Sequence, residues 1–157
     1  MDIYLKMVTN RDVMVKGGSK DADHVDWIEV LTFDRVYDRS VPPFTSEIRL
    51  MIVGSPAAEL WTLATAGVMV PTVILDVPAR REWYLFREAV VSQLRPIDRD
   101  DGPVITLMSF LITGAEHYPG AYAPTAAAAQ ALTRAAAQAT KALTRVTLAR
   151  LRRFLTK

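Results

Sequence analysis

The side chains best suited to metal chemistry lie between residues 21 and 26, where three aspartates surround one histidine: Asp21, Asp23, His24 and Asp26. Carboxylate oxygens and an imidazole nitrogen can together hold a divalent cation. The spacing lacks the distal bidentate glutamate of a calcium loop, however, and no second histidine lies nearby. We therefore interpret this acidic cluster as a solvated turn and expect no metal site.

Neither phosphate binding nor catalysis has a complete set of residues in this sequence. Residues 17–20 read Gly-Gly-Ser-Lys, but they lack the spacing of a phosphate-binding P-loop. The chain has no cysteine and no Gly-x-Ser-x-Gly sequence, and its two histidines, His24 and His117, both stand in turn-like settings. The pair Asp100 and Asp101 lies in a polar turn, where neither carboxyl group would be desolvated. We expect no catalytic residue and no cofactor, and hence a protein that is not an enzyme.

The length and composition fit one folded domain. The chain has 157 residues, of which 50% are hydrophobic and 23% are charged, and this balance is typical of a soluble globular protein. Asp2, Lys6 and Arg11 interrupt the segment where a signal peptide needs an apolar run. The most apolar stretch, residues 64–77, is shorter than the roughly 20 residues that cross a bilayer. We expect a protein made in the cytoplasm that, if secreted, leaves without a signal peptide.

The charge is divided unevenly along the chain. All seventeen acidic residues lie between Asp2 and Glu116, together with twelve of the nineteen Lys and Arg residues, so this part carries a net charge of −5. From His117 onward there are seven basic residues and no acidic one, a charge of +7. Such a division indicates a tail with its own role, or one that neutralises the body of the same protein.

Most of the acidic part has the period-two pattern of β-strands. Alternation or β-branched residues predict strands over residues 2–8, 27–33, 48–52, 72–77 and 104–112. The last of these is apolar on both faces, so it should be central or lie at an interface. Residues 83–94 fit a helical stripe and a strand equally well, and residues 95–102 read as a polar turn.

One short helix is predicted over residues 55–67. Ser55 is a good N-cap, Pro56 suits the first helical position, and Glu59 lies in the first turn, where an acidic residue is favourable. Leu60 and Leu63 follow helical spacing, and Gly67 can end the helix in a left-handed conformation. The helix should therefore lay one side on a sheet.

The last part of the chain predicts a basic amphipathic helix. We place a β-rich domain at residues 1–118 and an alanine-rich helical extension at residues 119–157. An apolar stripe runs along one side of this tail, consisting of Leu132, Ala136, Ala139, Leu143, Val146 and Phe154. A basic ridge runs along the opposite side, consisting of Arg134, Lys141, Arg145 and Arg152. These two surfaces are the candidate partner-binding residues.

Several partners remain open for the tail. The simplest interpretation is that the apolar stripe docks on the acidic body or on a neighbouring subunit, because an amphipathic face must be covered. The basic ridge could also contact an anionic membrane surface or another protein. Nucleic acid is disfavoured, because beyond Tyr122 the tail has only Phe154 as an aromatic and so no stacking platform.

The order of these segments resembles the haemolysin-coregulated protein (Hcp) family, the tube subunits of the bacterial type VI secretion system. The most specific part is residues 15–21 (VKGGSKD), followed by His24 and residues 27–33 (WIEVLTF). The resemblance covers about residues 1–116 and continues through the matching segments 1–6, 55–67, 71–75, 83–92 and 103–110. The family has a strand where residues 83–94 are ambiguous, so the resemblance favours a strand there.

The resemblance implies a mainly β fold: a two-sheet β-barrel with one short flanking α-helix. It also implies a homo-hexameric ring that stacks into a tube, sheath and spike components as partners, effector cargo in the lumen, and secretion through the type VI apparatus. The loop over about residues 34–46 is shorter than in the family, where it joins stacked rings, and this bears on stacking more than on ring formation. The alternative is a stand-alone β-barrel binding module whose basic helix engages a membrane or an acidic protein. Oligomeric state separates the two.

The tail generates a direct test of packing against charge. Changing Leu143 and Val146 to Asp should release the tail and make it protease-sensitive, because an isolated alanine-rich helix is only partly stable. Reversing Arg134, Lys141 and Arg145 to Glu should leave its protection unchanged, because exposed ion pairs contribute only about 0–1 kcal/mol each. Limited proteolysis of the full chain measures both effects. Equal loss of protection in the two variants would contradict the dominance of packing.

Overall fold

The computed structural model describes residues 2–9, 14–15, 17, 19–37 and 41–122. The chain divides into two compact units, Met1–Tyr122 and Ala123–Lys157. The second unit, and with it the predicted tail helix, lies outside the described residues. The first unit contains the whole of the expected β-rich domain, which continues as strand to Pro119.

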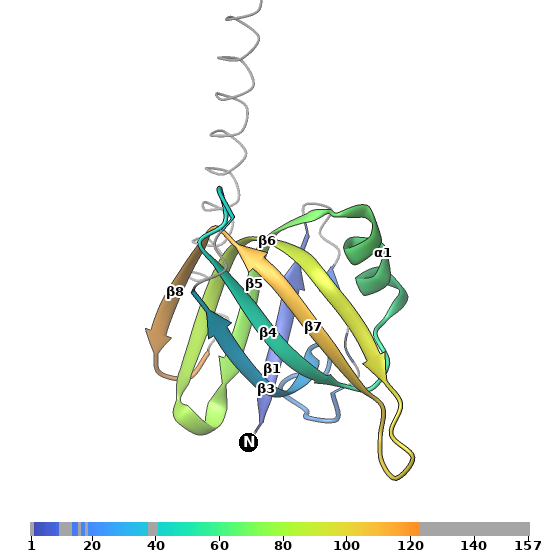
Figure 1. Ribbon diagram of the computed structural model, residues 1–157. Coiled ribbons are helices and arrows are strands. Elements are labelled where there is room, and N and C mark those ends of the chain that lie inside the picture. The colour runs from blue at the N-terminus through green and yellow to red at the C-terminus, as the bar shows by residue number, and fades with distance from the viewer. Residues whose placement is uncertain (1, 10–13, 16, 18, 38–40, 123–157) are drawn as a thin grey trace, which may run out of the picture. The chain divides into compact units, whose positions relative to one another are not determined.

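The first unit is a closed antiparallel β-barrel (Figure 1). Its strands are β1 (Ile3–Val8), β2 (Met14–Val15), β3 (Ile28–Val36), β4 (Ser46–Val53), β5 (Met69–Val77), β6 (Glu82–Ile97), β7 (Ile105–Ile112) and β8 (Gly114–Pro119). The hydrogen-bonded order is β1-β3-β4-β7-β6-β5, and β5 pairs again with β1 to close the barrel. The short β2 pairs with β1, and β8 pairs with β6. The predicted mainly β fold is confirmed.

Alternation along the strands builds the core. In β1 the inward residues Ile3, Leu5 and Met7 are fully buried, as the period-two pattern predicts. The other strands contribute inward side chains in the same way, among them Ile48, Leu50, Ile52, Val73, Leu75, Phe86, Met108, Phe110 and Ile112. A single contiguous apolar cluster thus fills the barrel.

Strand β6 settles the ambiguous segment and extends it. Residues 83–94 are strand, in agreement with the resemblance, and the strand runs on to Ile97. The predicted polar turn from Arg95 is therefore wrong for its first three residues. The ladder to β7 continues through Arg95↔Leu107 and Ile97↔Ile105, so cross-strand pairing outweighs the local polarity of this segment.

Helix α1 (Ala58–Ala66) is the only α-helix in the described part of the chain. It begins later than predicted: the N-cap is Ala57, with no side-chain capping bond, so Ser55 does not cap it. Its end is as predicted, because Gly67 adopts φ 60° and its N–H bonds to the carbonyl of Leu63. Leu60 and Leu63 are buried, and this face lies against the barrel. No helix in the described ranges is long and apolar enough to cross a membrane.

Two segments contain more strand than the sequence predicted. His117, interpreted as lying in a turn-like setting, and Pro119, placed in the helical extension, both belong to β8, where His117 pairs with Tyr84 and Pro119 with Glu82. The expected short loop after the second long strand begins later, because β3 continues to Val36 before the chain reaches β4 at Ser46. In both places a neighbouring strand completes the hydrogen bonding of residues that locally read as turn.

Gly17 offers a test of this packing. A Cβ atom at this position would lie 2.0 Å from the carbonyl oxygen of Trp27, so Gly17→Ala must displace backbone. We expect a loss of about 1–3 kcal/mol in the free energy of unfolding, measured by urea titration. Gly102→Ala is the control, because nothing lies within 4 Å of its Cβ position, and it should change stability by less than about 0.5 kcal/mol. Equal stability of the two variants would contradict the close approach.

Candidate assembly surface

Strands β4 and β7 present apolar residues on both of their faces. They pair without a register shift from Ser46↔Ile112 to Val53↔Ile105. Because successive side chains alternate, Ile48, Leu50 and Ile52 fill the core while Met51 points outward and is 41% exposed. Met51 faces Leu107 across the ladder, and Leu107 is only half-buried. Strand β7 lies between β4 and β6 in the sheet, so the prediction that residues 104–112 form a central strand is confirmed.

The outer face of these strands is hollowed. A depression of about 300 Å³ spans β3, β4, β6 and β7 and is lined by Thr32, Phe33, Asp34, Arg49, Leu50, Met51, Gln93, Leu107, Met108 and Ser109. Register shifts border it on both sides, between Val30 and Thr32 in β3 and between Val91 and Gln93 in β6. Such bulges bend a strand locally. An apolar centre with a few polar groups beside it is suited to contact with another protein.

Among the described residues the barrel wall also has an open strand edge. Strand β8 pairs with β6 along one edge, and among the described residues no strand pairs with its other edge. Its charged side chains are paired locally: Glu116 with Arg87, and His117 with Glu82 at 3.0 Å. Charged residues on an edge strand limit uncontrolled pairing with other chains.

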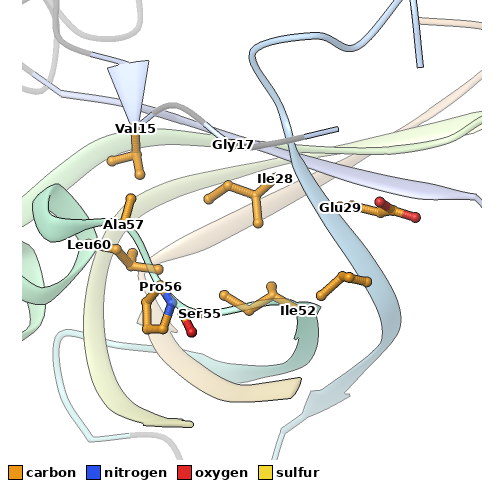
Figure 2. A pocket seen from close by; sticks show the side chains of 10 residues that line it. Val15, Gly17, Ile28, Glu29, Ile52, Ser55, Pro56, Ala57 and Leu60 are labelled. Carbon is orange, nitrogen blue, oxygen red and sulfur yellow. The ribbon is translucent and has the colours of Figure 1, made fainter. Parts of the chain in front are cut away.

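A smaller pocket lies beside the start of α1 (Figure 2). It has a volume of about 160 Å³, and its walls are chiefly the apolar side chains Val15, Ile28, Ile52, Val53, Pro56, Ala57 and Leu60. In Figure 2 the carboxylate of Glu29 points away from these side chains. The pocket therefore provides van der Waals contact, with no charged group pointing into it from the residues that the figure labels.

The residues of the acidic cluster differ in their exposure to solvent. Asp23 and Asp26 are exposed, as a solvated turn requires. His24, in contrast, has a side chain only 12% exposed, and its Nε2 atom lies 2.8 Å from Oδ2 of Asp76 on β5. On the other side of the ring, Nδ1 lies 3.5 Å from Oδ1 of Asp21. The interpretation as a solvated turn is thus wrong for His24, because a strand 52 residues away supplies its partner.

Asp76 is the residue that sequence reasoning missed. It is 4% exposed, and its Oδ1 atom is buried without a hydrogen-bond partner in the described part of the chain. The available signal was a lone carboxylate in an otherwise apolar strand, since such a group is rarely buried unless it is paired. The described residues contain no group of three or more potential ligands arranged for a metal ion.

Three side chains around this cluster have shifted pKa values. Burial, with a hydrogen bond to Asp21, raises the pKa of Tyr4 to about 12. The backbone N–H of Asp23 and the hydroxyl of Tyr4, which donates to Asp21 at 3.0 Å, lower the pKa of Asp21. Burial and the charge of Asp76 raise the pKa of Tyr122. Both tyrosines thus stay neutral, and Asp21 stays ionised, through the physiological pH range.

The remaining candidate residues of the sequence either have a structural role or lie outside the described part of the chain. Gly17 serves close backbone packing against Trp27, and Lys20 is exposed. The candidate partner-binding residues of the tail all lie outside the described part of the chain: Leu132, Arg134, Lys141, Leu143, Arg145, Val146 and Arg152. Their roles stay predictions.

Comparison with solved structures identifies the fold. The chain is similar to Hcp1 from Salmonella typhimurium, with a TM-score of 0.61 and 21% identity over 75% of this chain and 86% of that one. It is also similar to a type VI secretion system effector from Yersinia pestis, with a TM-score of 0.57 and 16% identity over 75% and 99%. The secreted protein Hcp3 from Pseudomonas aeruginosa matches with a TM-score of 0.53 and 10% identity over 77% and 99%.

The similarity of this chain to the Hcp proteins was found by comparing structures. No protein-family model matches the sequence, and no curated protein matches it. At 10–21% identity these three structures show that the chain shares the fold of the Hcp proteins. The resemblance noted in the sequence is therefore confirmed at the level of the fold.

Proposed function

With the Hcp fold as the premise, we propose that this chain is a non-enzymatic, ring-forming structural subunit of a type VI secretion-like tube. Six copies form a closed ring, and the ring is ejected with effector cargo in its lumen. Its partners are further copies of the chain, the sheath and spike components, and the cargo. Export through this apparatus needs no signal peptide.

The observation that carries the proposal is the outer face of β4 and β7. Met51 and Leu107 lie side by side there and line a 300 Å³ depression, which Asp34 and Arg49 also line. Burying exposed apolar surface contributes about 25 cal/mol per Å², so a neighbouring copy on this face would be stabilised by it. Cyclic symmetry also lets every copy cover the same surface of the next one.

The absence of catalysis is part of the proposal. The buried His24–Asp76 pair has no serine, threonine or cysteine bonded to it in the described residues, so it lacks the side-chain nucleophile of covalent catalysis. Glu29 is the one ionisable residue that lines the 160 Å³ pocket, and its carboxylate points away from the other labelled side chains (Figure 2). Both features fit a structural protein.

Disrupting the outer face should dissociate the ring. Introducing Met51→Glu together with Leu107→Glu places two charges in the proposed contact, where each would be buried without a partner. We expect the wild-type chain to be hexameric and the double variant to be monomeric by light scattering at the same concentration. Circular dichroism should show an unchanged barrel, because both side chains point out of the core.

Val68→Glu is the matched control. Val68 is 40% exposed, close to the 41% of Met51, but it lies after α1, away from the β4–β7 face. This variant should keep the wild-type mass. A wild-type chain that is monomeric at every concentration would overturn the ring and favour the stand-alone binding module.

A further inference from the structure

The outer side of the barrel wall carries a second buried layer. Ile74 on β5 lies opposite Leu85 on β6. Their chain neighbours Leu75 and Phe86 fill the core, so alternation turns the first pair outward. Ile74 and Leu85 are nonetheless buried, with 0% and 6% of their surface exposed. An outward side chain of a barrel becomes this inaccessible when another part of the chain covers that face.

A row of larger side chains continues this layer two positions further along the same strands, and so on the same face. The ladder register places one residue each from β1, β5, β6 and β8 side by side: Tyr4, Asp76, Trp83 and Tyr118. The rings of Trp83 and Tyr118 stack with their centres 4.1 Å apart. Tyr4 and Asp76 are buried, whereas Trp83 and Tyr118 are half-buried. The row is therefore covered more fully at its β1 and β5 end.

Residues 21–27, the strap, lie against that end of the row. Two backbone bonds close turns within the strap, from the N–H of His24 to the carbonyl of Asp21 and from the N–H of Trp27 to the carbonyl of His24. The His24 ring stacks on Tyr4 at 3.9 Å, and its Nε2 atom lies 2.8 Å from Oδ2 of Asp76. Because the strap belongs to no strand, its hold on the barrel depends on side-chain contacts of this kind.

Tyr122 joins the strap to β6. Its ring makes an edge-on contact with Trp27 of the strap, 5.2 Å between ring centres, and a second one with Trp83 of β6, at 5.3 Å. Edge-to-face pairs at such distances are favourable beyond the area that they bury. Two residues earlier, the N–H of Gly120 bonds to the carbonyl of Arg81, next to the start of β6. Backbone and ring therefore both fix this part of the chain beside β6.

We propose that Tyr122 is a latch: seated between Trp27 and Trp83, its ring holds the strap closed over the outer face of β1 and β5. The strap loosens when Tyr122 leaves this seat, because Trp27 then keeps the contact with Lys6, 5.4 Å from its ring centre, but loses its connection to β6. Tyr122 is also the last residue of the first unit, before residues 123–157. One contact thus fixes both the strap and the point where the extension begins. The latch lies within one chain and does not depend on ring formation.

Amide hydrogen exchange of the full chain tests the latch, with the amides of His24 and Trp27 as reporters because they close the turns of the strap. In Tyr122→Ala we expect their protection to fall about tenfold, as the loss of two ring contacts implies, while β4 and β7 keep theirs. Tyr122→Phe should retain the wild-type protection, because the ring contacts do not need the hydroxyl. Unchanged reporters in Tyr122→Ala, an equal loss in β4 and β7, or an equal loss in Tyr122→Phe would overturn the latch.

Another tyrosine supplies the matched control. Tyr37 also packs against a side chain, that of Arg35 at 4.4 Å, but it is 63% exposed and follows the end of β3. Tyr37→Ala should therefore leave the strap as protected as in the wild type, and a tenfold loss in this variant would contradict the assignment to Tyr122. Trp83→Leu gives a second route if Tyr122→Ala does not fold. It removes the other side of the seat and should loosen the strap as well, so unchanged strap protection in Trp83→Leu would also count against the latch.

Discussion

The antiparallel pairing of β4 with β7 is the interaction on which the rest of the structure depends. The two strands run together over eight residue pairs without a slip. A shift by one residue would turn Ile48, Leu50 and Ile52 out of the core, so burial of these side chains specifies the register. The same register places Met51 beside Leu107 on the outside. One pairing therefore produces both the core and the surface through which we propose that copies associate.

The strands show how far sequence reasoning reaches in this fold. The residue pattern was sufficient to predict the strands over residues 2–8 and 104–112, because in these strands the local pattern and the tertiary environment agree. Residues 83–94 were not decidable from periodicity, because β6 changes partners along its length, pairing with β8 at Trp83 and with β7 at Leu94. A register shift between Val91 and Gln93 also breaks any simple period. Only the resemblance to a known family resolved that segment.

The predictions for the start of the helix and for His24 in the acidic cluster were wrong for a different reason. Ser55 has the right chemistry for a cap, yet the chain turns into helix only after Ala57, and propensity alone does not place such a boundary. The environment of His24 depends on Asp76, which lies in another strand 52 residues further on. Local sequence carries no record of such a long-range contact, although a lone aspartate in an apolar strand is a visible warning. The outward apolar face of β7 was predictable because it lies within one strand.

The central claim is that the apolar face of β4 and β7 closes a ring of identical chains. Native mass spectrometry of the wild-type chain tests this most directly, because it counts subunits without relying on a variant. We expect a dominant species of six 17.4 kDa chains that persists on dilution. A single 17.4 kDa chain at every concentration would contradict it.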